Sequence, residues 1–165
     1  MPSSSAGPAV TLVPHPESMP SKVTLRQATA ADAGFACGVV DRTIRIYAEQ
    51  TFESWPVAEA HARTTGDAAA GRLQIMELDG QSIGIMKVER IDTHIQLHQL
   101  FILPEYQRRG IGSELLENLL AEGRASGLPV RLRVLRVNPA KRLYERHGFR
   151  VTSEEPERFY MECAP

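Results

Sequence analysis

The chain has 165 residues, enough for one compact domain with a sizeable core. Apolar residues make up 42% and charged residues 24%, the composition of a globular protein, and the net charge of −1 argues against a long polyanion as partner. No apolar run approaches the roughly 20 residues that cross a bilayer, so no membrane segment is predicted and a cytoplasmic protein is expected.

The N-terminal part of the chain is rich in Pro and Ser and lacks the basic start and continuous apolar stretch of a signal peptide. We expect a flexible arm over residues 1–22 and a single domain over residues 23–165. The domain begins with an alternating segment, Val23–Gln27, that predicts a strand. Apolar residues at helical spacing then predict a helix from Ala30 to about Gln50, and a short second helix is predicted from Pro56 to about Thr64.

The middle of the chain carries the pattern of a β-hairpin. Leu73–Leu78 and Ile83–Ile91 are apolar segments joined through Asp79-Gly80, a dipeptide that readily takes the positive φ angles of a tight turn. Ile95–Leu103 is a further apolar segment. The region is therefore predicted to form a hairpin followed by another strand.

The clearest helix of the sequence runs from Gly110 to about Ser126. Its leucines form one apolar stripe, and Gly127 stands at the natural stop. A strand, Val130–Val137, follows, and Asn138-Pro139 opens a last helix that Gly148 closes. The chain ends in two predicted strands, Phe149–Thr152 and Arg158–Met161. The order β-α-α-β-β-β-α-β-α-β-β predicts an α/β fold with helices packed on a sheet.

A glycine-containing loop joins the strand ending near Leu103 to the start of the long helix. Gly110 and Gly112 leave backbone N–H groups unobstructed, so the chain can approach a ligand closely. These N–H groups and the positive end of the helix dipole predict a phosphate or pyrophosphate site, beside which Arg108 and Arg109 add positive charge. Taken alone, the loop is equally typical of an ordinary strand-to-helix turn, because it lacks the third glycine of a dinucleotide fingerprint and the Gly-Lys-Ser/Thr of a P-loop.

Two segments together resemble a known family. Gln107-x-x-Gly110-x-Gly112 matches the Arg/Gln-x-x-Gly-x-Gly/Ala signature of the GCN5-related N-acetyltransferases, and Asn138–Phe149 resembles the second conserved block of that family. The similarity covers about Lys22 to Met161. It implies the GNAT fold, a mixed and mostly antiparallel sheet of about six to seven strands flanked by about four helices. It also implies transfer of an acetyl group from acetyl-CoA to a primary amine of a small molecule or peptide.

The resemblance implies roles for individual residues as well. Main-chain groups of Leu100, Phe101 and Ile102 would line the pantetheine arm of acetyl-CoA. The pyrophosphate would lie on the loop residues Arg108, Arg109, Gly110, Ile111, Gly112 and Ser113. Asn138 would contact the pantetheine or order its helix, and Tyr144 would direct its hydroxyl at the CoA sulfur. A phenol there can protonate the leaving thiolate, although the same ring is also suited to pack in the core.

The sequence leaves three alternatives for the general base that deprotonates the amine. Family members often use a Glu on the strand before the loop, and no acid lies between Asp92 and Glu105 here. His98 is the candidate because histidine ordinarily titrates near neutrality, while a lone strand histidine also serves as a hydrogen-bonded structural residue. Glu89 is a second candidate, and transfer without a dedicated base is a third alternative. Because Cys37 and Cys163 show no nucleophile–base pairing, direct attack in a ternary complex is expected.

Acceptor specificity is expected from a polar and aromatic cluster around the end of the first predicted helix. Its members are Arg45, Tyr47, Glu49, Phe52 and Trp55. The cluster is equally consistent with an amphipathic helix end whose Trp55 packs in the core. The three histidines His61, His94 and His147 show no metal-ligand spacing, so surface positions and no metal site are expected.

Two other functional classes remain alternatives. A CoA-binding module without chemistry would keep the same motifs but lack turnover. A nucleic-acid-binding protein would use the basic segment 105–150, which holds 10 Lys/Arg against 5 Asp/Glu. Its candidate contacts are Arg131, Arg133, Arg136, Lys141, Arg142 and Arg146, which are also suited to the 3′-phosphate of CoA. The modest total charge argues against nucleic acid, and a homodimer stays open.

Overall fold

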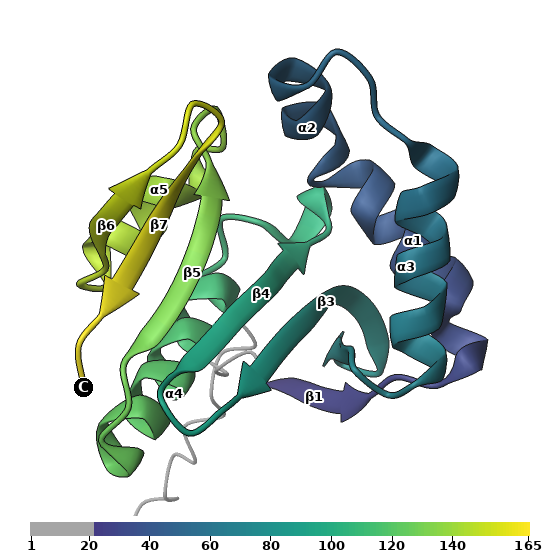
Figure 1. Ribbon diagram of the computed structural model, residues 1–165. Coiled ribbons are helices and arrows are strands. Elements are labelled where there is room, and N and C mark those ends of the chain that lie inside the picture. Colours follow the sequence, from purple (N-terminus) through teal and green to yellow (C-terminus); the bar gives the residue numbers. More distant parts are fainter. Residues whose placement is uncertain (1–21) are drawn as a thin grey trace, which may run out of the picture.

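One seven-stranded sheet forms the centre of the molecule, in the order β1-β2-β3-β4-β5-β7-β6 (Figure 1). The computed structural model describes residues 22–165, so the arm predicted before Lys22 lies outside the described residues. The strands are β1 (Val23–Gln27), β2 (Gln74–Leu78), β3 (Gln81–Arg90), β4 (Ile95–Ile102), β5 (Val130–Leu135), β6 (Arg150–Glu154) and β7 (Arg158–Cys163). Only β4 and β5 pair in parallel among the neighbours. The predicted mixed and mostly antiparallel sheet is therefore confirmed.

Five α-helices of the described chain cover the sheet. They are α1 (Ala33–Arg42), α2 (Arg45–Thr51), α3 (Val57–Ala69), α4 (Ile111–Ser126) and α5 (Ala140–Arg146). The alternation of strand side chains divides the core in two. Ile75 and Ile85 face the side of α1 and α3, whereas Met76 and Met86 belong to the larger cluster that includes the buried stripe of α4. α1 and α3 thus lie on one face of the sheet, and α4 lies on the other (Figure 1).

The single helix predicted from Ala30 to about Gln50 is wrong in one respect, because the chain breaks there into α1 and α2. The break falls at Thr43, whose φ and ψ of −122° and −79° leave the helical region. The Thr43 hydroxyl donates to the Val39 carbonyl (2.7 Å), the kind of side-chain bond that competes with the helical ladder. α3 in turn continues past Thr64 to Ala69. The segment after β1 therefore forms two short helices, α1 and α2, rather than one long helix.

The predicted turn at Asp79-Gly80 and the predicted glycine stop of the long helix are confirmed. Asp79 and Gly80 have φ angles of 50° and 81°, and Leu78 pairs directly with Gln81 across the turn. Gly127 ends α4 with φ of 68°. These positive angles are the conformations that Gly, and less readily Asp, adopt at low cost.

Gly84 on β3 sets how closely β3 and β4 approach. It pairs with Ile102, and a Cβ at this position would lie 2.3 Å from the Phe101 carbonyl oxygen. Gly84→Ala is therefore expected to lower the free energy of unfolding by about 1–3 kcal/mol, measured by chemical denaturation. Gly66→Ala in α3, where a Cβ meets nothing within 4 Å, is the matched control. It should stabilise by up to ~1 kcal/mol, and equal stability of Gly84→Ala and wild type would contradict this close packing.

Candidate active site

The two parallel strands at the centre of the sheet separate partway along their length. Pairing of β4 with β5 covers only three positions and ends at Leu97 and Leu132, although both strands continue (Figure 1). On its other side β4 carries a register shift that leaves His98 without a partner on β3. Such a bulge bends the strand that contains it. The result is a notch between β4 and β5, open toward α2 and α5.

The residues of the loop after β4 fix the conformation of that loop. The Gln107 side-chain amide donates to the Ile102 carbonyl (2.8 Å), which ties the loop back to the end of β4. Arg108 and Gly110 both have left-handed φ angles, 62° and 80°. A glycine relieves the strain at one of these two turns but not at the other. This path delivers the chain to the first residue of α4, directly beside the notch.

The first turn of α4 presents backbone donors that the helix itself does not use. The ladder begins where the Glu114 N–H donates to the Gly110 carbonyl (3.0 Å). The amides of Ile111–Ser113 precede it and have no intrahelical acceptor. A Cβ on Gly112 would lie 3.4 Å from Leu143 Cδ2 and 3.6 Å from Ile102 Cδ1, both ordinary contacts. Internal packing therefore does not require a glycine at this position.

Polar side chains surround this helix start. Ser113 Oγ lies 3.2 Å from His147 Nε2, so the residue after α5 fixes the serine of the loop. Arg109 places its guanidinium 5.2 Å from the centre of the Tyr106 ring, and Arg108 is exposed. The sequence predicts a surface position and no role for His147. Its contact with Ser113 joins residues 34 positions apart, which no local pattern reveals.

α5 borders the notch that opens toward it. Its first amide, that of Ala140, donates to Asn138 Oδ1 (2.9 Å), so Asn138 orders the helix start as expected, although α5 begins one residue after Pro139. Tyr144 is only 8% exposed and packs edge-on against Phe149, with ring centres 5.8 Å apart. Burial raises the pKa of Tyr144 to about 12. The phenol is therefore a neutral hydrogen-bond donor at physiological pH.

One cavity of about 550 Å³ joins these features, and we name it the notch cavity. Nearly all of the predicted cofactor-site residues line it: Leu100, Phe101, Ile102, Arg108, Gly110, Ile111, Gly112, Ser113, Asn138 and Tyr144. Arg109 is the exception, since it lies over Tyr106 rather than along the wall. The structure thus brings the two sequence motifs together around a single space.

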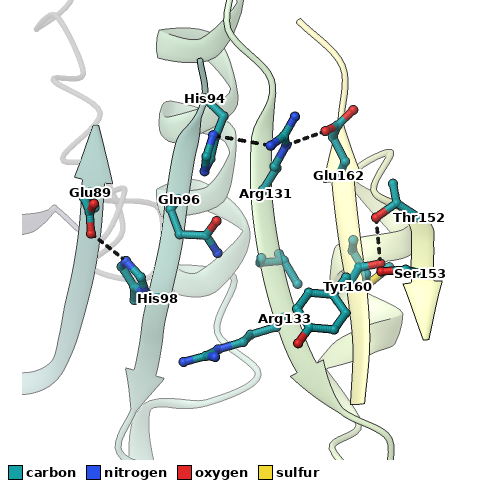
Figure 2. A pocket seen from close by; sticks show the side chains of 12 residues that line it. Glu89, His94, Gln96, His98, Arg131, Arg133, Thr152, Ser153, Tyr160 and Glu162 are labelled. Atoms are coloured by element: carbon teal, nitrogen blue, oxygen red, sulfur yellow. Dashed lines mark hydrogen bonds and ion pairs between the residues drawn. The ribbon is translucent and has the colours of Figure 1, made fainter. Parts of the chain in front are cut away.

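A second cavity, of about 590 Å³, lies on the sheet face opposite α4, and we name it the open-face cavity (Figure 2). Its wall consists mostly of polar side chains from β3, β4, β5, β7 and β6, together with Leu132 and Met161. His98 lines this cavity and not the notch cavity. Its Nε2 lies 3.1 Å from Glu89 Oε2, so the two sequence candidates for the base contact each other.

The predicted acceptor cluster is only partly assembled. Tyr47 lines the notch cavity, together with neighbours from the α1–α2 connection. Arg45 instead forms an ion pair with Glu49, 2.7 Å apart, and Phe52 is 38% exposed. Trp55 packs against the core cluster of α1 and α3. α2 therefore contributes one aromatic side chain to the notch cavity rather than a complete pocket.

The basic side chains of segment 105–150 lie in different places, some in ion pairs and some along one or the other cavity. Three of the six side chains considered for nucleic acid form ion pairs within the chain: Arg131–Glu162, Arg136–Glu154 and Lys141–Glu145. Arg131 and Arg133 line the open-face cavity, whereas Arg146 lines the notch cavity. This division disfavours a continuous basic stripe of the kind that follows a nucleic-acid backbone.

Among residues 22–165, no group of three or more His, Cys, Asp or Glu side chains is placed to hold a metal ion. Within the same part of the chain, no helix is long and apolar enough to cross a membrane.

Comparison with known proteins identifies the family. The acetyltransferase (GNAT) domain profile matches residues 69–151, about half of the chain, and this stretch contains the notch, the loop and α5. The chain belongs to the GNAT acetyltransferase family. It is also 25% identical over 140 residues to the uncharacterized N-acetyltransferase YafP of Escherichia coli, covering 82% of this chain and 86% of YafP.

Solved GNAT structures share the fold. The PaiA N-acetyltransferase of Thermoplasma acidophilum, crystallised with coenzyme A, superposes with a TM-score of 0.67 at 20% identity, covering 87% of this chain and 99% of that chain. An acetyltransferase from Thermus thermophilus superposes with a TM-score of 0.69 at 20% identity, covering 87% of this chain and 97% of that chain. The fold of the chain is thus that of GNAT acetyltransferases.

Proposed function

We propose that the protein transfers an acetyl group from acetyl-CoA to the primary amine of a small molecule or peptide. The observation that carries this proposal is the notch cavity, which the unused amides of the α4 start and the side chain of Tyr144 both line. The amides of Ile111–Ser113, with the helix dipole, suit the pyrophosphate of CoA. The unpaired edge of β4 at Leu100–Ile102 offers backbone groups to the pantetheine arm.

The geometry supports direct transfer. The amine nitrogen bonds to the thioester carbonyl carbon, the C–S bond breaks, and the sulfur takes a proton from the Tyr144 hydroxyl. The proton that the amine gives up balances this one and returns through solvent to the Tyr144 oxygen, which leaves the amide, the CoA thiol and the neutral phenol. A donor that is neutral and buried suits this step, because it delivers the proton as charge develops on the sulfur. The proton of the amine leaves on the other side of the sheet, where His98 lies at the open-face cavity.

His98 and Glu89 act together as the base in this proposal. Glu89 accepts the hydrogen bond of His98 Nε2, which orients the ring and leaves Nδ1 as the proton acceptor. The His98 side chain is 28% exposed, so protons can return to solvent. The strand carboxylate that is absent from β4 is thus supplied from β3, one strand away.

Replacement of His98 tests this role. His98→Gln is expected to lower kcat by about tenfold, since water can still accept the proton. Glu89→Gln should have a smaller effect in the same direction. His61→Gln is the control, because His61 pairs with Asp41 away from both cavities. A His98→Gln enzyme with the kcat of wild type would exclude the base role.

The proposed function itself is tested by thiol release. Purified protein is incubated with acetyl-CoA and a panel of primary amines, with free CoA thiol and acetylated amine both measured. Amine-dependent thiol release with matching product supports the proposal. Tight acetyl-CoA binding without transfer to any amine would instead indicate a CoA-binding module without chemistry.

A further inference from the structure

The open-face cavity contains one arginine whose charge no acidic side chain of residues 22–165 neutralises. Arg131 forms an ion pair with Glu162, 2.6 Å apart, and Glu89 bonds to His98. Arg133 is exposed and forms no ion pair among residues 22–165. A guanidinium with free donors is suited to hold a carboxylate through two parallel hydrogen bonds.

Arg133 stands at the mouth of the notch. The β4–β5 register pairs Gln96 with Arg131 and Leu97 with Leu132, so His98 and Arg133 are the next two residues, one on each strand, where pairing stops. Both line the open-face cavity. In Figure 2 the Arg133 side chain extends from β5 toward β4, on the side where His98 lies. The candidate base and the free cation therefore flank the same opening.

The distance to the notch cavity is short. Leu100, which lines the notch cavity, follows His98 by two residues on β4, a rise of about 7 Å along a strand. An amine that extends through the opening between β4 and β5 thus places its nitrogen near His98. A carboxylate a few bonds from that nitrogen then lies within reach of the Arg133 guanidinium. Arg133 would repel a second cationic group on the acceptor, and this repulsion disfavours the binding of polyamines.

We infer that the acceptor is a small amine that carries a carboxylate close to its nitrogen, such as an amino acid, and that Arg133 binds this carboxylate. The inference rests on the proposed acetyl transfer and names its substrate class. Arg133 determines specificity here, while the nitrogen itself lies near His98. Tyr160 and Gln96 line the same cavity.

Matched acceptor pairs test the inference. L-alanine with ethylamine, and L-phenylalanine with phenethylamine, differ only in the carboxylate. Wild type should favour the amino acid of each pair in kcat/KM by about tenfold or more, the size expected for a charge-assisted contact. Arg133→Gln should abolish this preference, Arg133→Lys should retain part of it, and Arg124→Gln, at the far end of α4, should leave it unchanged.

The two possible failures can be told apart. Equal kcat/KM for both members of each pair in wild type, with transfer intact, would overturn the carboxylate inference and leave the acetyltransferase proposal standing. Transfer to none of the four probes would also overturn the inference. Calorimetric titration of the same protein with acetyl-CoA then shows whether the proposed cofactor site fails with it.

Discussion

Tyr144→Phe is expected to lower kcat for acetyl transfer by about 10²–10³-fold, the range lost with a general acid. Phenylalanine keeps the ring that packs against Phe149, so the folded structure and the acetyl-CoA affinity should stay as in wild type. Steady-state thiol release measures the rate, and calorimetry and thermal unfolding provide the controls. An unchanged kcat would show that the buried tyrosine serves packing alone.

The pH dependence follows from the same hydroxyl. Burial raises the pKa of Tyr144 to about 12, and the acid must be protonated to act. The contribution of Tyr144 to the rate of acetyl transfer is therefore fully present at neutral pH and is lost only as the pH rises toward 12. Any limb of the wild-type profile below roughly pH 10, the value of an unperturbed phenol, should then persist in Tyr144→Phe at a uniformly lower rate.

Gly112→Ala is expected to weaken acetyl-CoA binding by about 100-fold while the fold remains intact. The added methyl would lie beside Ile102 and Leu143, both of which line the notch cavity, and would hold a phosphate away from the α4 amides. Loss of one charge-assisted hydrogen bond, worth about 1.5–3 kcal/mol, accounts for an effect of this size. Dissociation constants from calorimetry measure it.

Stability separates this effect from misfolding. Alanine favours a helix over glycine by about 1 kcal/mol, so Gly112→Ala should unfold at the same temperature as wild type or higher. Gly66→Ala, the same chemical change in α3, should leave binding unchanged. Gly110 is less informative, because its φ of 80° makes any substitution strained. Wild-type affinity in Gly112→Ala would place the pyrophosphate elsewhere.

Features encoded by a few neighbouring residues could be predicted from the sequence. The Asp79-Gly80 turn, the buried stripe of α4 and the glycine stop at Gly127 depend on local geometry, and the structure confirms all three. The break at Thr43 depends on one hydroxyl that bonds to a backbone carbonyl, which apolar spacing does not report. The helix expected from the spacing is therefore too long.

The base and the free arginine could not be assembled from the sequence. The contact of His98 with Glu89 depends on the register of β3 with β4 and on the bulge at His98. The position of Arg133 depends on the parallel register of β4 with β5, between strands separated by a whole helix. The alternation within a strand shows on which face of the sheet a side chain lies. Only the pairing of the strands shows which residues of the neighbouring strand lie beside it.

A nuclear magnetic resonance titration of the protein with acetyl-CoA tests most directly whether the notch cavity is the cofactor site. We expect the largest amide shifts at Ile111, Gly112 and Ser113, with further shifts at Leu100–Ile102 and at Tyr144. Amides of the remote hairpin at Asp79-Gly80 should not move. Saturating binding that leaves the amides of Ile111–Ser113 unshifted, or no binding at all, would contradict the assignment of this notch to acetyl-CoA.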